Sequence, residues 1–179
     1  MKAVVFLVVL SFSVLSFAAD NNSKMKPDFY IGIGGISGDQ EFASVKQSTS
    51  GKKVFLFEKT KWGLVGELHL LDLDYNKTSG DKDALYVRSL GYSILYSVGQ
   101  TENVMPYFKF GYHNWKANYF VSETEPKHSS QSSFFYGLGV NIHMFKTWFL
   151  RVEHETFTIK ADETTASLNL SSISIFSSF

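Results

Sequence analysis

Apolar residues recur at every second position in about eight consecutive segments of this chain, and this alternation constrains its fold more than any other feature. A period of two is typical of β-strands that bury one face. The connections between the segments alternate between long and short, and the sequence ends on an aromatic residue, Phe179. Together these features predict an all-β fold, an eight-stranded antiparallel up-and-down transmembrane β-barrel.

Residues 1–18 are expected to be a secretory signal peptide. Lys2 supplies a positive charge, residues 4–15 are almost all apolar, and small residues follow at a site that fits cleavage after Ala18 or Ala19. The apolar run is too short for a helix that stays in a membrane. The chain is therefore expected to be exported.

The remainder is assigned to a short polar lead-in at residues 19–27 and to one barrel domain at residues 28–179. Removal of the signal peptide leaves 16 basic and 17 acidic residues, so no general basic surface for nucleic acid is expected. The chain has no cysteine. An exported protein of this size needs another source of stability, and a closed hydrogen-bonded barrel in lipid provides one.

The expected strands have approximate bounds of 28–38, 53–58, 62–75, 84–98, 105–120, 134–144, 148–159 and 164–179. The long connections are residues 39–52, 76–83, 121–132 and 160–163, which we expect on the extracellular side. The short connections lie near Thr60, Gly99 and Lys146, which we expect on the periplasmic side. An even number of strands lets the first pair with the last, and this closure removes exposed strand edges.

The side chains opposite the apolar face indicate that the apolar face meets lipid. They are mostly glycine with a few ionisable groups, as a narrow lumen requires. Ionisable residues of both signs recur on this face, and we predict that five of them form an ion-pair network in the lumen: Glu67, Lys109, Arg151, Glu153 and Glu155. Aromatic residues near strand ends are expected at the membrane interface: Trp62, Trp148, Tyr92 and Tyr96. The alternative left open is a soluble secreted barrel that carries an apolar ligand inside.

Two segments resemble the OmpA-like outer-membrane barrel family. Residues 136–145 read YGLGVNIHMF, and residues 146–157 read KTWFLRVEHETF, which is similar to the penultimate hairpin of that family. Residues 107–115, YFKFGYHNW, resemble its fifth strand. The resemblance covers essentially the whole mature chain and implies location in the bacterial outer membrane. It also implies that a peptidoglycan-binding domain, found in longer members, is missing.

The resemblance further implies partners and roles. Ile173, Ile175 and Phe179 are in phase on the last strand, similar to the C-terminal signal that the outer-membrane insertion machinery reads. In this family, lumen ion pairs plug or gate small barrels, and here we expect a structural plug. The expected function is structural, or interaction of the extracellular loops with a host or envelope partner, in contact with outer-membrane lipids.

One enzymatic alternative is a lipid A-modifying barrel, because His154 is expected on the lipid face. Enzymes of that kind carry a serine two residues after the histidine, and this chain has Thr156 there. We therefore predict no catalytic residues and no enzyme. His69, His113 and His143 fall on different expected strands, so we predict no metal site, and no cofactor is expected.

Overall fold

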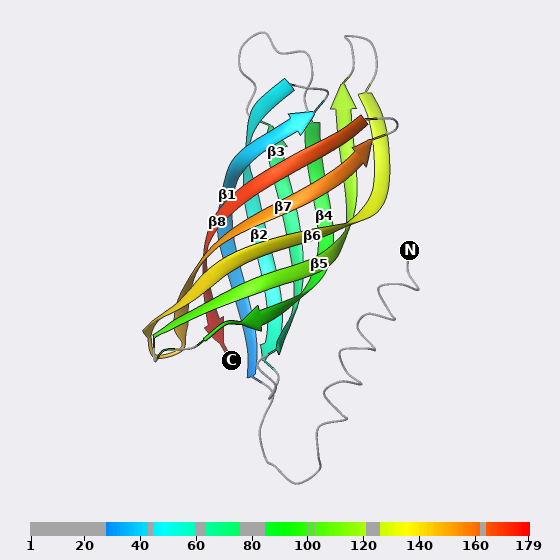
Figure 1. The fold of residues 1–179 in the computed structure, drawn as a ribbon. Helices are drawn as coiled ribbons and strands as arrows, with labels where there is room; N and C mark the ends of the chain where they lie inside the picture. The colour runs from blue at the N-terminus through cyan, green and yellow to red at the C-terminus, as the bar shows by residue number, and fades with distance from the viewer. Residues whose placement is uncertain are drawn as a thin grey trace.

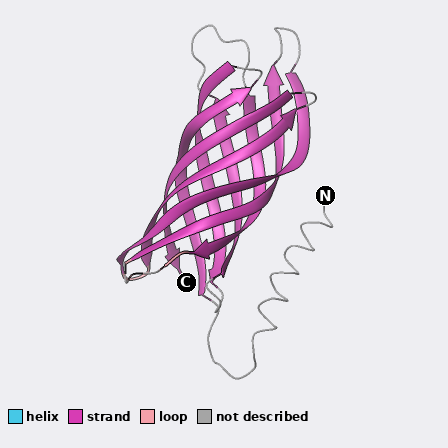
Figure 2. Ribbon diagram, viewed as in Figure 1, coloured by secondary structure: helices cyan, strands magenta, loops and turns pink. Residues whose placement is uncertain are grey.

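A computed structural model describes residues 28–42, 45–59, 64–75, 85–99, 101, 103–120, 126–161 and 164–179. These residues form eight strands, and Figure 2 shows strand throughout the wall. The strands are β1 (Asp28–Phe42), β2 (Val45–Lys59), β3 (Leu64–Tyr75), β4 (Leu85–Ser97), β5 (Val104–Phe120), β6 (Pro126–Phe145), β7 (Trp148–Ala161) and β8 (Thr164–Ser178). None of the described residues forms a helix long and apolar enough to span a membrane.

Each strand pairs antiparallel with the next in sequence, and β1 also pairs with β8, so the sheet is a closed barrel. Figure 1 shows the eight strands winding around one axis, with the C-terminus at the end where the short turns lie. This is the predicted all-β, eight-stranded up-and-down topology. Closure leaves the wall without an unpaired edge along its shared length.

The register fixes the tilt of the strands. A row of paired residues that starts at Val140 on β6 passes through Val152, Ile173 and Gly35 on β7, β8 and β1. It continues around β2 to β5 and returns to β6 at Ser130, ten residues from its start. A stagger of this size in eight strands corresponds to a tilt of about 40° and to a lumen that side chains fill.

The strands are longer than predicted at the end of the barrel where the long connections lie. The expected loop at residues 39–52 is mostly strand, because β1 continues to Phe42 and β2 begins at Val45. Likewise, β6 begins inside the expected loop 121–132, and β7 extends into 160–163. At these ends of β1 and β2 the inward residues, such as buried Gln40 and Thr49, are polar like the outward ones, so the alternation disappears while backbone pairing continues. Residues 76–83, together with the signal peptide and lead-in assignments, lie outside the described residues.

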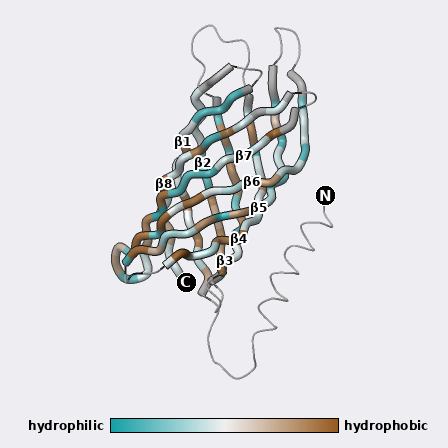
Figure 3. The backbone as a smooth tube through the Cα atoms, in the orientation of Figure 1, coloured by the Kyte–Doolittle hydropathy of each residue, from teal (hydrophilic) through white to brown (hydrophobic). Residues whose placement is uncertain are grey.

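The outward face of the barrel is apolar around its lower part, as expected for contact with lipid. Ile31 and Ile33 on β1, Phe108 and Phe110 on β5, and Ile173 on β8 are all more than half exposed. Figure 3 shows the hydrophobic residues concentrated towards the end of the barrel that holds the C-terminus. The opposite end is more hydrophilic, which fits strands that extend past the membrane surface.

Candidate functional site in the barrel lumen

The lumen holds a compact layer of six buried charged side chains. Lys53 comes from β2, Glu67 from β3, and Lys109 from β5. The other three, Arg151, Glu153 and Glu155, alternate along β7. Inward side chains of a strand are two residues apart, so one strand supplies three members at successive heights. Three positive and three negative groups make the layer neutral, which a low-dielectric interior requires.

Two carboxylates of β7 bind the amine of Lys53 across the lumen. Lys53 Nζ donates to Glu155 Oε2 at 2.7 Å and to Glu153 Oε1. Glu153 also accepts a hydrogen bond from Tyr107 Oη at 2.8 Å and one from Ser172 Oγ at 3.2 Å. Both carboxylates and the Lys53 side chain are at most 1% exposed. This part of the layer joins β2, β5, β7 and β8.

Glu67 is the second anionic centre of the layer. Lys109 Nζ donates to Glu67 Oε1 at 2.6 Å and lies 2.7 Å from Glu155 Oε1. Arg151 Nη1 donates to Glu67 Oε2. Lys109 therefore connects the two anionic centres, and removal of any one member would leave the buried layer with an uncompensated net charge.

Arg151 closes the charged layer on the side of the short connections. Its Nε donates to Asn141 Oδ1 at 2.8 Å. The guanidinium carbon also lies between 4.4 and 5.3 Å from the centroids of four rings: Phe55, Phe57, Tyr107 and Phe176. Arginine over aromatic faces gains cation–π attraction when it is desolvated. Arg151 thus joins the ion pairs to the aromatic side chains below them.

Apolar clusters cover both sides of the charged layer. The lower one consists of Phe55, Phe57 and Phe176, against which Tyr30, Val65 and Phe149 pack. The upper one has eleven members: Ile36, Leu71, Leu73, Val87, Trp115, Ala117, Phe135, Phe157, Ile159, Leu168 and Leu170. The expectation that glycine and ionisable groups dominate the interior was wrong in this respect. A period of two assigns a residue to the inward or the outward face, but it does not show whether the inward face is exposed to water. Only the closed barrel shows which inward positions are buried.

Glycines make room for these large side chains. A Cβ at Gly32 would lie 2.3 Å from the Phe55 ring, and one at Gly139 would lie 2.5 Å from Tyr107 Oη and 2.8 Å from Glu153 Cβ. Real Cβ atoms do not approach so closely. The alternating glycines of β1 and β6 therefore allow an eight-stranded barrel to hold aromatic rings and ion pairs at its axis.

The structure brings together all five residues predicted for the lumen network. Sequence reasoning missed Lys53, because residues 54–57 of β2 are apolar on both faces and give no period of two. It also missed Tyr107, which only the register places beside Glu153.

The interior histidines do not converge. His69 and His113 are buried, and each packs edge-on against the Phe135 ring. His113 bonds Ser89 Oγ at 2.9 Å and Ser133 Oγ at 2.7 Å, whereas His143 lies near the periplasmic turn and bonds the Lys146 carbonyl. Within the described ranges, no three His, Asp or Glu side chains are grouped to hold a metal ion.

The aromatic residues predicted for the membrane interface face outwards where they are described. Tyr96 at the end of β4 and Trp148 at the start of β7 are 58% and 44% exposed, next to short connections. Tyr92 is higher on β4, between Leu68 and Tyr112. Trp62 lies outside the described residues. Ile173, Ile175 and Phe179 also face outwards, and the Phe179 ring stacks on Phe29 with centroids 6.4 Å apart.

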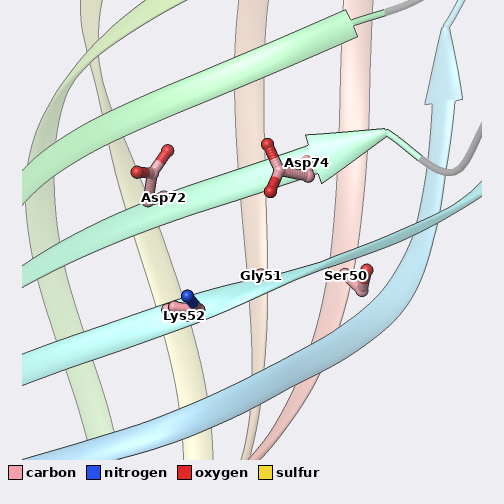
Figure 4. A pocket seen from close by; sticks show the side chains of 5 residues that line it. All are labelled: Ser50, Gly51, Lys52, Asp72 and Asp74. Carbon is pink, nitrogen blue, oxygen red and sulfur yellow. The ribbon is translucent and has the colours of Figure 1, made fainter.

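A polar depression lies on the outer wall between β2 and β3, towards the end of the barrel opposite the C-terminus. Its lining is Ser50, Gly51, Lys52, Asp72 and Asp74 (Figure 4). Asp72 accepts hydrogen bonds from Tyr86 Oη at 2.7 Å and Arg88 Nε at 3.3 Å. The charged side chains of the lining, Lys52, Asp72 and Asp74, are exposed, so the depression is an electrostatically weak surface feature.

His154 faces outwards, as predicted for the enzymatic alternative. Its Nδ1 lies 3.0 Å from Ser171 Oγ on β8, and Thr156 Oγ1 donates to Asn169 Oδ1 at 3.0 Å. In the described part of the chain no carboxylate hydrogen-bonds to His154, and Glu153 and Glu155 on either side point into the lumen. A serine and a histidine without an orienting acid lack the third group of a hydrolytic triad.

Comparison with known proteins identifies relatives of this architecture. The family model described as outer membrane protein beta-barrel domain matches residues 4–175. Neisserial surface protein A has a similar structure, with a TM-score of 0.69 and 16% identity over 84% of this chain and 97% of that chain. Ail of Yersinia pestis has a TM-score of 0.59 and 13% identity, covering 85% of this chain and 99% of that one. OprG of Pseudomonas aeruginosa has a TM-score of 0.53 and 15% identity, covering 89% and 99%. No curated protein matches the sequence.

Proposed function

Because the chain belongs to the outer membrane protein beta-barrel family and is located in the bacterial outer membrane, we propose that it is a closed, non-enzymatic barrel that acts through its extracellular surface. The lumen network of Glu67, Lys109, Arg151, Glu153 and Glu155 is a structural plug in this proposal. The insertion machinery reads its C-terminal strand through Ile173, Ile175 and Phe179.

The filled lumen supports the proposal that the barrel is plugged. A charged layer lies between two apolar clusters, and the six charged side chains are all at most 2% exposed. Ions cross a barrel only through a hydrated path, and side chains of these three layers occupy the axis. A plug therefore explains the buried charges better than a gate does.

The hairpin of β5 and β6 supports the proposal that the barrel acts through its extracellular surface. The ladder between β6 and β7 ends at Phe135 and Phe157, whereas β5 and β6 remain paired up to Phe120 and Pro126. β4 stays paired with β5 up to Leu85 and Tyr119, so β6 is the strand that extends past its ladder with β7. This part of the wall bears exposed polar side chains such as Lys116 and Ser130. Surfaces of this kind on a rigid scaffold are suited to binding. Ail, which shares the fold, is named as an attachment invasion locus protein.

Planar-bilayer recordings test the plug. The purified barrel should give no reproducible conductance, and it should still migrate faster on electrophoresis when unheated. Reproducible single-channel steps at moderate voltage would overturn the plug and favour a gated pore.

Shortening of the β5–β6 hairpin tests the surface role. Replacement of residues 120–126 by a short turn keeps the buried Ala117 and the pairs of β5 with β4, and it should leave the barrel in the outer-membrane fraction with its heat-modifiable migration. Cells that carry the shortened barrel should lose adhesion to a host-cell layer, or to one another, relative to cells with the full barrel. Equal behaviour of the two strains would contradict a role for this surface.

A further inference from the structure

The upper part of β6 is a strand that has a neighbour on one side only. β5 pairs with β6 from Pro126 to Ile142. The ladder between β6 and β7 stops at Phe135 and Phe157, although both strands continue beyond this pair. Above Phe135, β6 therefore pairs only with β5 among the described residues, and Figure 1 shows it continuing past the end of β7. We call residues 128–133 the β6 edge.

The backbone phase of β6 shows which groups the β6 edge presents. Near the short connection, the His143 N–H donates to the Asn103 carbonyl next to β5 at 2.8 Å. In an antiparallel ladder, residues two apart direct their N–H and C=O groups to the same neighbour, and the register of β5 with β6 has no shift. Odd-numbered residues of β6 thus bond β5. The residues that direct their N–H and C=O groups to the other side, where no described strand pairs with them, are His128, Ser130 and Ser132.

The β6 edge lacks the features that usually protect an edge strand. Natural edges carry lysine, proline, a bulge or an inward charge. The β6 edge reads HSSQSS, without lysine, proline or acidic residue, and no bulge interrupts its pairing with β5. Gln131 is exposed although it is at an inward position, whereas its partner on β5, Trp115, is buried. The outward Ser130 and Ser132 are exposed as well. The edge is therefore open on both faces of the sheet.

The repeat of the β6 edge selects the class of partner. Its free donors and acceptors recur at every second residue, which is about 6.8 Å along a strand. An extended polypeptide repeats complementary groups at the same spacing, whereas sugars and lipid headgroups do not. The edge begins above Phe134, the last outward apolar residue of β6, so it lies on the water side of the lipid-facing wall.

We infer that the β6 edge binds an extended segment of another protein at the cell surface, which pairs through its backbone as an added ninth strand. Because the side chains of the edge are uncharged or weakly basic and mostly small, the backbone carries the recognition, and the bound segment needs no apolar face. This inference rests on the proposed surface role and names the kind of partner that the surface takes.

The test uses a fluorescent peptide with the sequence HNWKANY, residues 113–119, because this stretch of β5 already pairs with the other side of β6. Binding to the barrel in nanodiscs is measured by anisotropy, with empty nanodiscs as the baseline. A second peptide carries N-methyl groups on its central residues, which removes backbone donors and keeps every side chain. Ser130→Pro removes an N–H that points away from β5, a position where an edge strand tolerates proline. Ser130→Ala is the matched control, because it keeps that N–H.

The unmodified peptide should bind the wild type and Ser130→Ala equally. It should bind Ser130→Pro about tenfold more weakly, as expected for the loss of backbone hydrogen bonds. The N-methylated peptide should show no saturable binding. Equal binding of the two peptides, equal binding to all three proteins, or no saturable binding would overturn the inference. Self-association of the wild type that Ser130→Pro loses would assign the edge to a second copy of this chain and would also overturn it.

Folding and the proposed surface role are checked separately. Heat-modifiable migration verifies that each variant is folded, and the comparison of the two peptides needs only the wild type. Loss of adhesion on shortening of the hairpin, together with equal binding of the two peptides, would keep the surface role and overturn backbone pairing at the β6 edge. Unchanged adhesion together with binding of the unmodified peptide alone would keep backbone pairing and contradict the surface role of the hairpin tip.

Discussion

Lys53 on β2 donates a hydrogen bond to Glu155 on β7 across the lumen, with 2.7 Å between Nζ and Oε2. The two residues are far apart in sequence, and their strands are not neighbours in the sheet. The contact therefore fastens one wall of the barrel to another independently of the backbone ladder. It also explains how a narrow lumen accommodates two adjacent glutamates of β7.

Replacement of Lys53 by methionine should destabilise the barrel strongly. Glu153 and Glu155 would lose a shared cation, and removal of one partner of a buried ion pair costs about 3–5 kcal/mol. The measurement is urea unfolding of the barrel in lipid vesicles. Lys52→Met is the matched control, because Lys52 faces outwards on the same strand, and its substitution should change the unfolding free energy by no more than about 0.5 kcal/mol. Equal effects at the two positions would show that the lumen contact does not stabilise the fold.

Tyr107→Phe should weaken the charged layer to a smaller degree. The substitution removes the hydrogen bond to Glu153 while the ring stays beside Arg151. Glu153 keeps its bonds to Lys53 and Ser172, so the expected loss is about 1.5 kcal/mol, typical of a hydrogen bond to a charged group. Tyr112→Phe, on the outward face of β5, serves as the control. If both substitutions leave the urea midpoint unchanged, the hydroxyl of Tyr107 contributes nothing to stability.

Gly139→Ala should lower the unfolding free energy of the barrel, whereas Gly35→Ala should raise it. A methyl group at Gly139 would meet Tyr107 and Glu153 at less than 3 Å, and such overpacking costs about 1–3 kcal/mol. At Gly35, which faces outwards, no atom lies within 4 Å of the new carbon. Alanine there restricts the unfolded chain and should stabilise the barrel by about 0.4–1 kcal/mol. Equilibrium unfolding of both variants measures the change in unfolding free energy. A stabilising Gly139→Ala would contradict the described lumen packing.

Phe179→Ala should reduce assembly of the barrel in cells. Phe179 continues the outward apolar phase of Ile173 and Ile175, and we propose that the insertion machinery reads this pattern. The amount of heat-modifiable barrel in the outer-membrane fraction should fall, whereas Phe179→Tyr, which keeps the ring, should assemble normally. Refolding of purified Phe179→Ala into vesicles separates the two explanations: normal refolding assigns the defect to recognition, and failed refolding assigns it to the contact with Phe29.

The sequence by itself determined the architecture, because the period of two reports directly which strands bury one face and how many there are. It also placed five charged residues on inward positions. Alternation along β7 assigns Arg151, Glu153 and Glu155, and alternation along β3 and β5 assigns Glu67 and Lys109. It could not find Lys53, because residues 54–57 beside it are apolar on both faces of β2. It also could not find the ends of β1 and β2, because both faces carry polar residues there and the pattern disappears. Only the tertiary structure decided which inward positions are dry, which charges pair across the lumen, and where β6 extends past its ladder with β7. Those properties depend on the stagger between strands, and the stagger is set by pairing between residues far apart in the chain.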